Sequence, residues 1–189
     1  MTSRLFFAVV VGPPAREAFR ETAEGLRKVL GSGVRWMEQE PHLTLAFLGE
    51  VPPERVSAAG AACRAAAAGQ PPFRARLGAL GAFPSWTSSR VLWLGLEDAG
   101  PMRGLALSLR DSLLSAGFSL EDRGFVPHVT LARSKGGRSF HADSLREGAP
   151  PLGGPAEFSV AEVVLFKSTL GPSGPFHEPL ERIPLGGPR

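Results

Sequence analysis

The chain has 189 residues and a mass of 20.0 kDa, enough for one well-packed domain or for two small lobes that share a core. Its 43% hydrophobic and 21% charged residues are those of an ordinary globular protein, and no run approaches the ~18 apolar residues of a membrane helix. A single cysteine, Cys63, excludes an internal disulfide and a multi-cysteine zinc site. We therefore expect a cytoplasmic protein, and the net charge of +3 favours an anionic partner without identifying one.

The first half of the chain alternates predicted strands and helices. Apolar, β-branched runs bounded by Gly and Pro indicate strands, and apolar residues at helical spacing indicate helices. In order, we predict a strand over 4–11, a helix over 15–30, a short strand over 34–37, a strand over 42–48 and an Ala-rich helix over 53–68.

The second half continues the alternation with one long interruption. We predict strands over 73–80 and 90–96, a helix over 101–115, a strand over 128–132, a strand over 160–166 and an edge strand over about 177–184. The stretch 134–154 is rich in Gly, Ser, Pro and charge, which predicts a mobile loop with a short helical turn near 141–146. This pattern indicates an α/β or α+β sandwich.

One short repeat stands out within the sequence. Pro-His-Leu-Thr-Leu-Ala at 41–46 and Pro-His-Val-Thr-Leu-Ala at 127–132 share five of six positions, and each begins a predicted strand. A lone His-x-Thr unit is most often structural, since Thr favours strands and His is often half-buried. Two copies with matched flanks instead predict two related lobes that each contribute one unit to a shared site.

The spacing within each copy has a chemical meaning. Side chains alternate along a strand, so His42 and Thr44 share one face, as do His128 and Thr130. Two such strands side by side give a square of two imidazoles and two hydroxyls. Imidazole titrates near neutrality and can act as acid or base, while hydroxyls can hold phosphoryl oxygens. The set suits phosphoryl transfer, in which one His activates water and the other protonates the leaving ribose oxygen.

These residues resemble the signature of the two-histidine (2H) phosphoesterase superfamily, and within it the RNA 2′,3′-cyclic phosphodiesterases, also called 2′-5′ RNA ligases. The resemblance extends over nearly the whole chain and includes RLFFA at 4–8, HLTLAFLGEV at 42–51, VLWLG at 91–95 and VLFKS at 164–168. It implies one α+β domain, 1–189, with two pseudo-symmetric lobes, each an antiparallel-type sheet flanked by helices, and the active-site cleft between them.

The resemblance also implies roles. His42 would be the general acid that protonates the leaving 3′-oxygen and His128 the general base, with the reverse order open, while Thr44 and Thr130 would bind the phosphate. Phe47 and Arg133 resemble positions that contact base or phosphate in relatives, although regular alternation turns both away from their histidines unless a bulge intervenes. Where relatives often carry a Tyr near the C-terminus, this chain, which has none, offers Phe176.

Other chemistries are less well supported. No carboxylates lie at metal-ligand spacing from either His-x-Thr unit, so we expect no metal and no cofactor. Cys63 lies in an Ala-rich helix and is expected to be a buried structural thiol. The expected partners are RNA ends or nucleotides with a 2′,3′-cyclic phosphate. We expect the protein to be a monomer that does not associate with a membrane. Two alternatives stay open: reversible 2′-5′ RNA joining by the same four residues, and RNA or nucleotide binding without turnover.

Overall fold

The computed structural model describes residues 2–30, 33–37, 39–121, 124–148, 154–171 and 174–186. Its helices are α1 (Ala15–Leu30), α2 (Pro53–Ala68), α3 (Gly100–Ser115) and α4 (Asp143–Gly148). Its strands are β1 (Ser3–Val10), β2 (Val34–Trp36), β3 (His42–Val51), β4 (Phe73–Phe83), β5 (Val91–Leu96), β6 (Val129–Ser134), β7 (Glu157–Val160), β8 (Glu162–Gly171) and β9 (Gly174–Pro184).

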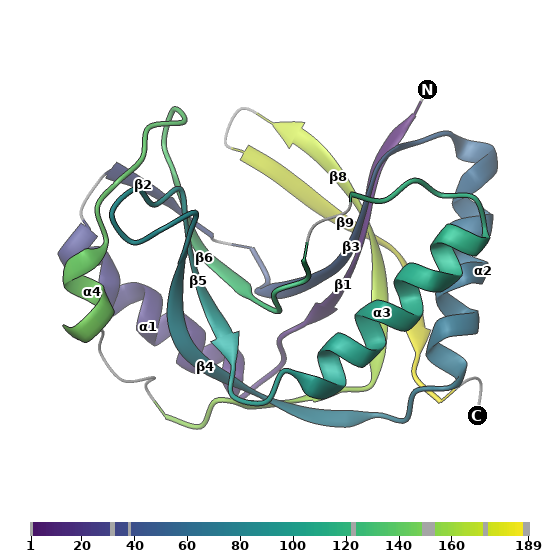
Figure 1. Ribbon diagram of the computed structural model, residues 1–189, viewed down its shortest axis with the longest axis horizontal. Coiled ribbons are helices and arrows are strands. Elements are labelled where there is room, and N and C mark those ends of the chain that lie inside the picture. Colours follow the sequence, from purple (N-terminus) through teal and green to yellow (C-terminus); the bar gives the residue numbers. More distant parts are fainter. Residues whose placement is uncertain are drawn as a thin grey trace.

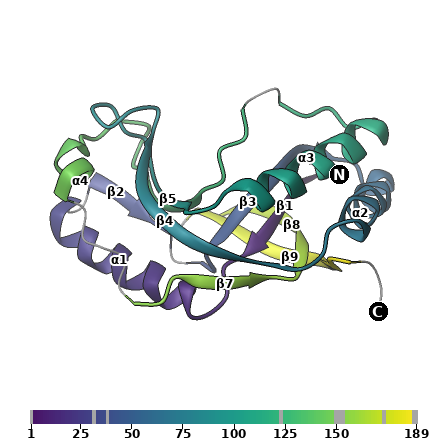
Figure 2. The same ribbon diagram turned by 60° about the horizontal axis from the view of Figure 1, so that its bottom comes forward.

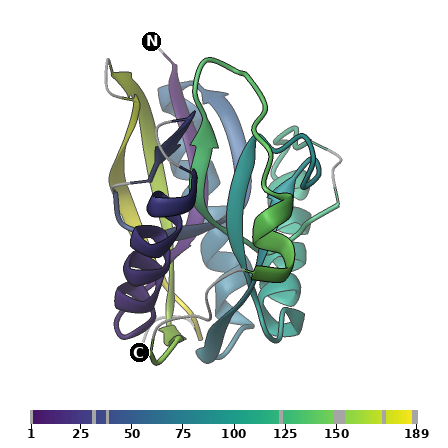
Figure 3. The same cartoon turned by 90° about the vertical axis from the view of Figure 1, so that its left-hand side faces the viewer.

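The strands form one curled antiparallel sheet. Its order is β7-β4-β5-β6-β3-β1-β8-β9, with β2 added beside β6. Helices flank this sheet at two places (Figure 1), with α1 and α4 on the side of β2 and β4, and α2 and α3 on the side of β1 and β8. Figure 2 shows the two pairs at opposite ends of the sheet, and Figure 3 looks from the side of α1 and α4, with α2 and α3 farther away. The predicted α+β class with two flanked halves is confirmed.

The central contact of the sheet lies between β3 and β6, which begin with the two repeated motifs. These strands pair antiparallel at Leu43 and Val129, and both side chains are fully buried in the core. Because alternate residues of a strand face opposite sides, the core anchors each motif through its apolar residue and turns its His and Thr to the other face. The fold thus determines the orientation of all four polar side chains.

The helices agree closely with the sequence pattern. The predicted bounds of α1 and α2 are those observed, and α3 begins one residue earlier than expected. In α1 the buried face carries Phe19 and Leu26 at helical spacing. Helix α2 begins with Pro53, and proline is tolerated at the first position of a helix because the backbone N–H there has no partner within the helix. Helix α2 packs against α3, β8 and β9. In the described part of the chain, no helix is long and apolar enough to span a bilayer.

Several predicted elements differ in detail. The strand expected over 160–166 is two strands, β7 and β8, because the chain changes neighbours from β4 to β1 at Ala161. The last strand begins at Gly174, since β8 and β9 pair as a long hairpin. Within the predicted loop 134–154, the described residues include α4 and a bridge between Ser89 and Phe140, whereas 149–153 lie outside them. The mobility of this loop stays a prediction.

Candidate active site

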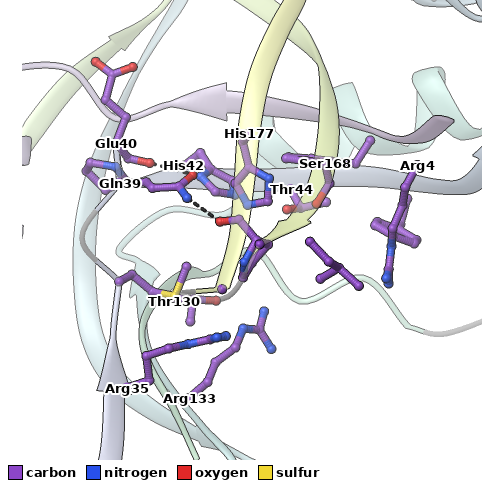
Figure 4. A pocket seen from close by; sticks show the side chains of 18 of the residues that line it. Arg4, Arg35, Gln39, Glu40, His42, Thr44, Thr130, Arg133, Ser168 and His177 are labelled. Atoms are coloured by element: carbon purple, nitrogen blue, oxygen red, sulfur yellow. Dashed lines mark hydrogen bonds between the residues drawn. The ribbon is translucent and has the colours of Figure 1, made fainter.

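The two motifs meet at one cavity of about 570 Å³. With Leu43 opposite Val129 in an antiparallel pair, His42 falls opposite Thr130 and Thr44 opposite His128. All four residues line the cavity, and Figure 4 shows His42, Thr44 and Thr130 facing it. The square of two imidazoles and two hydroxyls expected from the sequence is therefore present, with each imidazole beside the hydroxyl of the other motif.

The imidazoles of the two motifs are held by the same type of hydrogen bond. His42 Nδ1 lies 3.0 Å from the carbonyl oxygen of Glu40, and His128 Nδ1 lies 2.7 Å from that of Val126. A carbonyl can only accept a hydrogen bond, so Nδ1 carries the proton in both rings. Each Nε2 is consequently the atom that exchanges a proton, and it is the nitrogen available to a group in the cavity.

A shift in strand pairing follows the Thr of each motif. Along β1 and β3, Phe7 pairs with Ala46 but the next residue, Ala8, pairs with Thr44, so Leu45 is the extra residue. Between β5 and β6 the pairs Leu92–Ala132 and Trp93–Thr130 leave Leu131 extra in the same way. Both shifts have the pattern of a β-bulge, in which two residues oppose one. The two halves of the site thus share this irregularity as well as the motif.

These shifts explain how Phe47 and Arg133 reach the site. Each lies five residues after its histidine, on the wrong face of a regular strand, and each lines the cavity. Phe47 is 39% exposed, and the Arg4 guanidinium lies 4.8 Å from the centre of its ring. The bulge required by the sequence interpretation is present in both strands. The contacts of Phe47 and Arg133 with substrate remain a proposal.

Aromatic rings enclose the two histidines. His128 contacts Phe83 edge to face, with ring centres 5.1 Å apart, and lies 5.8 Å from the Trp93 ring. His42 lies 5.5 Å from the Phe6 ring and 6.0 Å from Phe166. Such contacts fix a ring without offering it a strong hydrogen-bond partner, so each imidazole is oriented but keeps its Nε2 free for chemistry.

A third histidine, which the sequence interpretation passed over, also lines the cavity. His177 stands edge-on to His42, with ring centres 5.3 Å apart and planes at 89°, and its Nδ1 is buried without a hydrogen-bond partner in the described residues. Its neighbour Phe176, which we expected in place of the relatives' Tyr, is 63% exposed and does not line this cavity. The correspondence of Phe176 with the relatives' Tyr stays a prediction. Alternation along β9 turns His177 inward and Phe176 outward.

Burial and positive charge lower the pKa of all three histidines. For His42 and His128 burial is the largest cause, with Arg133 lowering both pKa values further, while the hydrogen bonds to the Glu40 and Val126 carbonyls oppose the shift. The carboxylate of Glu40 also raises the pKa of His42. The pKa of His177 falls to about 4, through burial, His42 and Arg133. Without a bound anion, the site therefore favours neutral imidazoles.

Other polar groups of the cavity were not predicted. Arg4, Arg35, Gln39 and Ser168 all line it (Figure 4), and Gln39 donates a hydrogen bond to the Pro175 carbonyl. They come from three separate parts of the chain, with Arg35 and Gln39 in the same segment. No local motif marks them, because they meet only through the pairing of β1, β2 and β8 with distant strands.

Cys63 is excluded as a nucleophile by its environment. Cys63 is 1% exposed in α2, and burial, with a smaller contribution from Glu181, raises the pKa of its thiol to about 12. A thiol with this pKa forms almost no thiolate near neutral pH. Among the described residues, no three His, Cys, Asp or Glu side chains form a group that would hold a metal ion.

An α+β fold whose two halves present paired His-x-Thr strands to one cavity is the architecture expected of the two-histidine phosphoesterase superfamily. The family model described as the 2′-5′ RNA ligase superfamily matches residues 13–172. An RNA 2′,3′-cyclic phosphodiesterase of Geobacillus stearothermophilus is 33% identical over 98% of this chain, although this chain spans only 58% of that protein's length. One of Thermotoga maritima is 34% identical over 97% of this chain and 96% of its own length.

The fold agrees with these sequence matches. The crystal structure of TT0787 of Thermus thermophilus superposes with a TM-score of 0.78 at 32% identity, covering 98% of this chain and 100% of that one. The chain belongs to the 2′-5′ RNA ligase superfamily, and its fold is the fold of that family.

Proposed function

We propose that this protein hydrolyses the terminal 2′,3′-cyclic phosphate of RNA to a 2′-phosphate, with His42 as general acid and His128 as general base and without a metal ion. The observation that carries the proposal is the pairing of Leu43 with Val129, which sets two His-Thr pairs around one cavity. The names of the relatives supply the reaction class. The residues supply an acid, a base and donors for phosphoryl oxygens.

The proposed step conserves atoms and charge. Nε2 of His128 takes a proton from water as the water oxygen attacks phosphorus, and the bond from phosphorus to the 3′-oxygen breaks in line with it. Nε2 of His42 donates a proton to the departing 3′-oxygen, which leaves a 2′-phosphate and a 3′-hydroxyl. The hydroxyls of Thr44 and Thr130 hold the non-bridging oxygens as their charge grows.

The acid and base labels follow the resemblance to the family, because the charges near the two histidines act in opposite directions. Arg133 lowers the pKa of both rings. His42 has two further charged neighbours: His128, which lowers its pKa, and Glu40, whose carboxylate raises it and favours the protonated form. The reverse order of the two roles therefore stays open.

The test uses a short RNA with a 2′,3′-cyclic end, incubated with the protein and EDTA, followed by identification of the terminal phosphate. The proposal expects turnover in EDTA and a 2′-phosphate product. Absence of turnover would leave nucleotide binding without catalysis, EDTA-sensitive turnover would contradict the metal-free step, and a 3′-phosphate would contradict the assigned leaving oxygen. Adding an RNA with a free 5′-hydroxyl end to the same mixture reveals joining, if a longer product appears.

A further inference from the structure

Two arginines form an unusual cross-strand pair at the rim of the cavity. Arg35 on β2 lies directly opposite Arg133 on β6, and both side chains line the cavity beneath Thr130 (Figure 4). Directly opposed like charges destabilise an antiparallel pair. A carboxylate of the protein or a bound anionic ligand would relieve the repulsion between two arginines in this register.

The described residues provide no such carboxylate. Within the described residues, ion pairs with glutamates are formed by Arg16, Arg64, Arg74, Arg76 and Arg182. Arg35 and Arg133 take part in none of them. Glu40, the one carboxylate among the described residues of the cavity, is paired with Arg16 at 3.3 Å, and its carboxylate points away from both arginines (Figure 4). Within the part of the chain that the structure describes, no carboxylate neutralises the pair, which suits it to binding an anion.

The two arginines differ in their electrostatic effect on the histidines. The charge of Arg133 lowers the pKa of His42, His128 and His177, while Arg35 affects the pKa of Arg133 and of none of these histidines. Arg35 also packs against the backbone of Gly174, where a Cβ would lie 2.7 Å from Nη1. Arg133 is therefore the member whose charge reaches the histidines, and Arg35 is the member that packs against Gly174 at the start of β9.

We propose that Arg35, together with Arg133, binds the phosphodiester on the 5′ side of the terminal nucleotide, so that the protein selects RNA ends over isolated nucleoside 2′,3′-cyclic phosphates. This inference rests on the proposed function. In the proposed function the two His-Thr pairs bind the reacting phosphate. The next negative charge along an RNA end is the phosphodiester that links the terminal nucleotide to the preceding one. A nucleoside cyclic phosphate lacks it. Guanidinium groups suit such a diester because they donate two parallel hydrogen bonds to its oxygens.

The test compares three substrates that differ only upstream of the reacting phosphate. These are adenosine 2′,3′-cyclic phosphate, the dinucleotide ApA with a 2′,3′-cyclic end, and the same dinucleotide with an uncharged methylphosphonate linkage. Arg35→Met removes the charge and keeps the apolar stem. Arg20→Met, on the exposed side of α1, removes the same charge far from the cavity and serves as the matched control.

We expect Arg35→Met to lower kcat/KM for the charged dinucleotide by about 10- to 100-fold, the effect of one hydrogen bond to a charged group. The other two substrates should change by less than about 2-fold, and Arg20→Met should change none. The dependence of log kcat/KM on log salt should become shallower by about 0.7 for the dinucleotide alone, as for one lost phosphate contact. An equal loss of kcat/KM on all three substrates would mean that Arg35 contacts the reacting phosphate. An unchanged kcat/KM on all three would mean that Arg35 contacts none of the substrates. Either result overturns the proposal.

Two further measurements separate the possible failures. Arg35→Met removes a like-charge contact, so its free energy of unfolding should equal or exceed that of the wild type, and a loss of activity then reflects the missing contact. Calorimetric affinities for ApA with a 2′-phosphate and for adenosine 2′-phosphate require no turnover. If the wild type turns over no substrate but still prefers the dinucleotide through Arg35, the proposed hydrolysis fails while the phosphate subsite stands. If that preference is absent, the subsite fails.

Discussion

Gly81 and Trp93 face each other across β4 and β5, and this contact positions one side of the active site. A Cβ built on Gly81 would lie 2.2 Å from the nearest atom of the Trp93 ring, whereas ordinary contact begins at 3.4 Å. The substitution Gly81→Ala therefore requires a displacement of 3.4 − 2.2 = 1.2 Å. The ring is rigid, so it must move as a unit.

The displaced ring has His128 as a neighbour. Trp93 lies 5.8 Å from His128 and 4.9 Å from Phe83 between ring centres, and Phe83 in turn contacts His128. Overpacking of this kind costs about 1–3 kcal/mol of folding free energy. A misplacement of a catalytic group by ~1 Å costs about 100-fold in rate. We expect Gly81→Ala to lose roughly these amounts of stability and of kcat/KM.

Urea unfolding and turnover of an RNA with a 2′,3′-cyclic end measure the two effects. Gly95→Ala is a graded control, since its Cβ would lie 3.3 Å from the same ring. Gly104→Ala in α3 is a control without a clash, because its Cβ meets nothing within 4 Å, and it should gain about 0.5–1 kcal/mol of stability with unchanged turnover. In a Trp93→Leu background the methyl group has room, so Gly81→Ala should cost little further. Wild-type stability and turnover in Gly81→Ala, or an undiminished cost in the Trp93→Leu background, would refute this account of how His128 is held.

Three further predictions concern the histidines. His42→Ala and His128→Ala should each lower kcat by about 10²–10⁴-fold while changing the affinity for adenosine 2′-phosphate little, and equal losses of affinity and rate would instead indicate a binding role. Because burial lowers the pKa of both residues, the bell-shaped pH profile of kcat/KM should be centred below pH 6.5. Arg133→Met removes a nearby positive charge and should move the profile to higher pH. A profile that keeps its position in this variant would contradict the account. His177 has a pKa of about 4 when folded against 6.5 when unfolded, so the unfolded chain binds more protons and stability falls as the pH drops from 6.5 toward 4. Urea unfolding across this range should be less steep in His177→Phe, and identical slopes would exclude His177 as a source of the acid sensitivity.

The parts of the structure that sequence predicts well are those with local signals. Helices α1 and α2 have their predicted bounds because Pro residues precede each start and Gly follows each end. The active-site square follows from the repeat and from strand alternation alone. The residues that bound each helix lie within one segment of the chain, and so does each His-Thr pair, while the repeat indicates that the two pairs belong to one site.

The remaining site residues depend on contacts between distant segments. Leu45 and Leu131 mark the shifts in pairing, yet an apolar residue within an apolar strand looks the same whether it is bulged or regular. Arg35 acquires its role only because β2 adds beside β6. His177 has Gly- and Pro-rich surroundings and no motif of its own in the sequence, whereas the β8–β9 hairpin turns it toward His42. Long-range register, which a single sequence does not display, decided all of these placements.

The lowered pKa of His42 conflicts with its proposed role as an acid, and a bound anion acts against this shift. Burial lowers the pKa most, and Arg133 and His128 lower it further. A negative charge beside the ring offsets the effect of the two positive groups and favours the protonated ring. Anion binding should therefore take up a proton. Sulfate is a suitable probe because, unlike a phosphate monoester with a pKa of about 6, it does not titrate near neutrality. Calorimetric titration with sulfate at pH 7, in two buffers of different ionisation enthalpy, should show proton uptake in the wild type and less in His42→Ala. Binding without uptake would mean that His42 stays neutral beside an anion, and the acid would then have to be a different group.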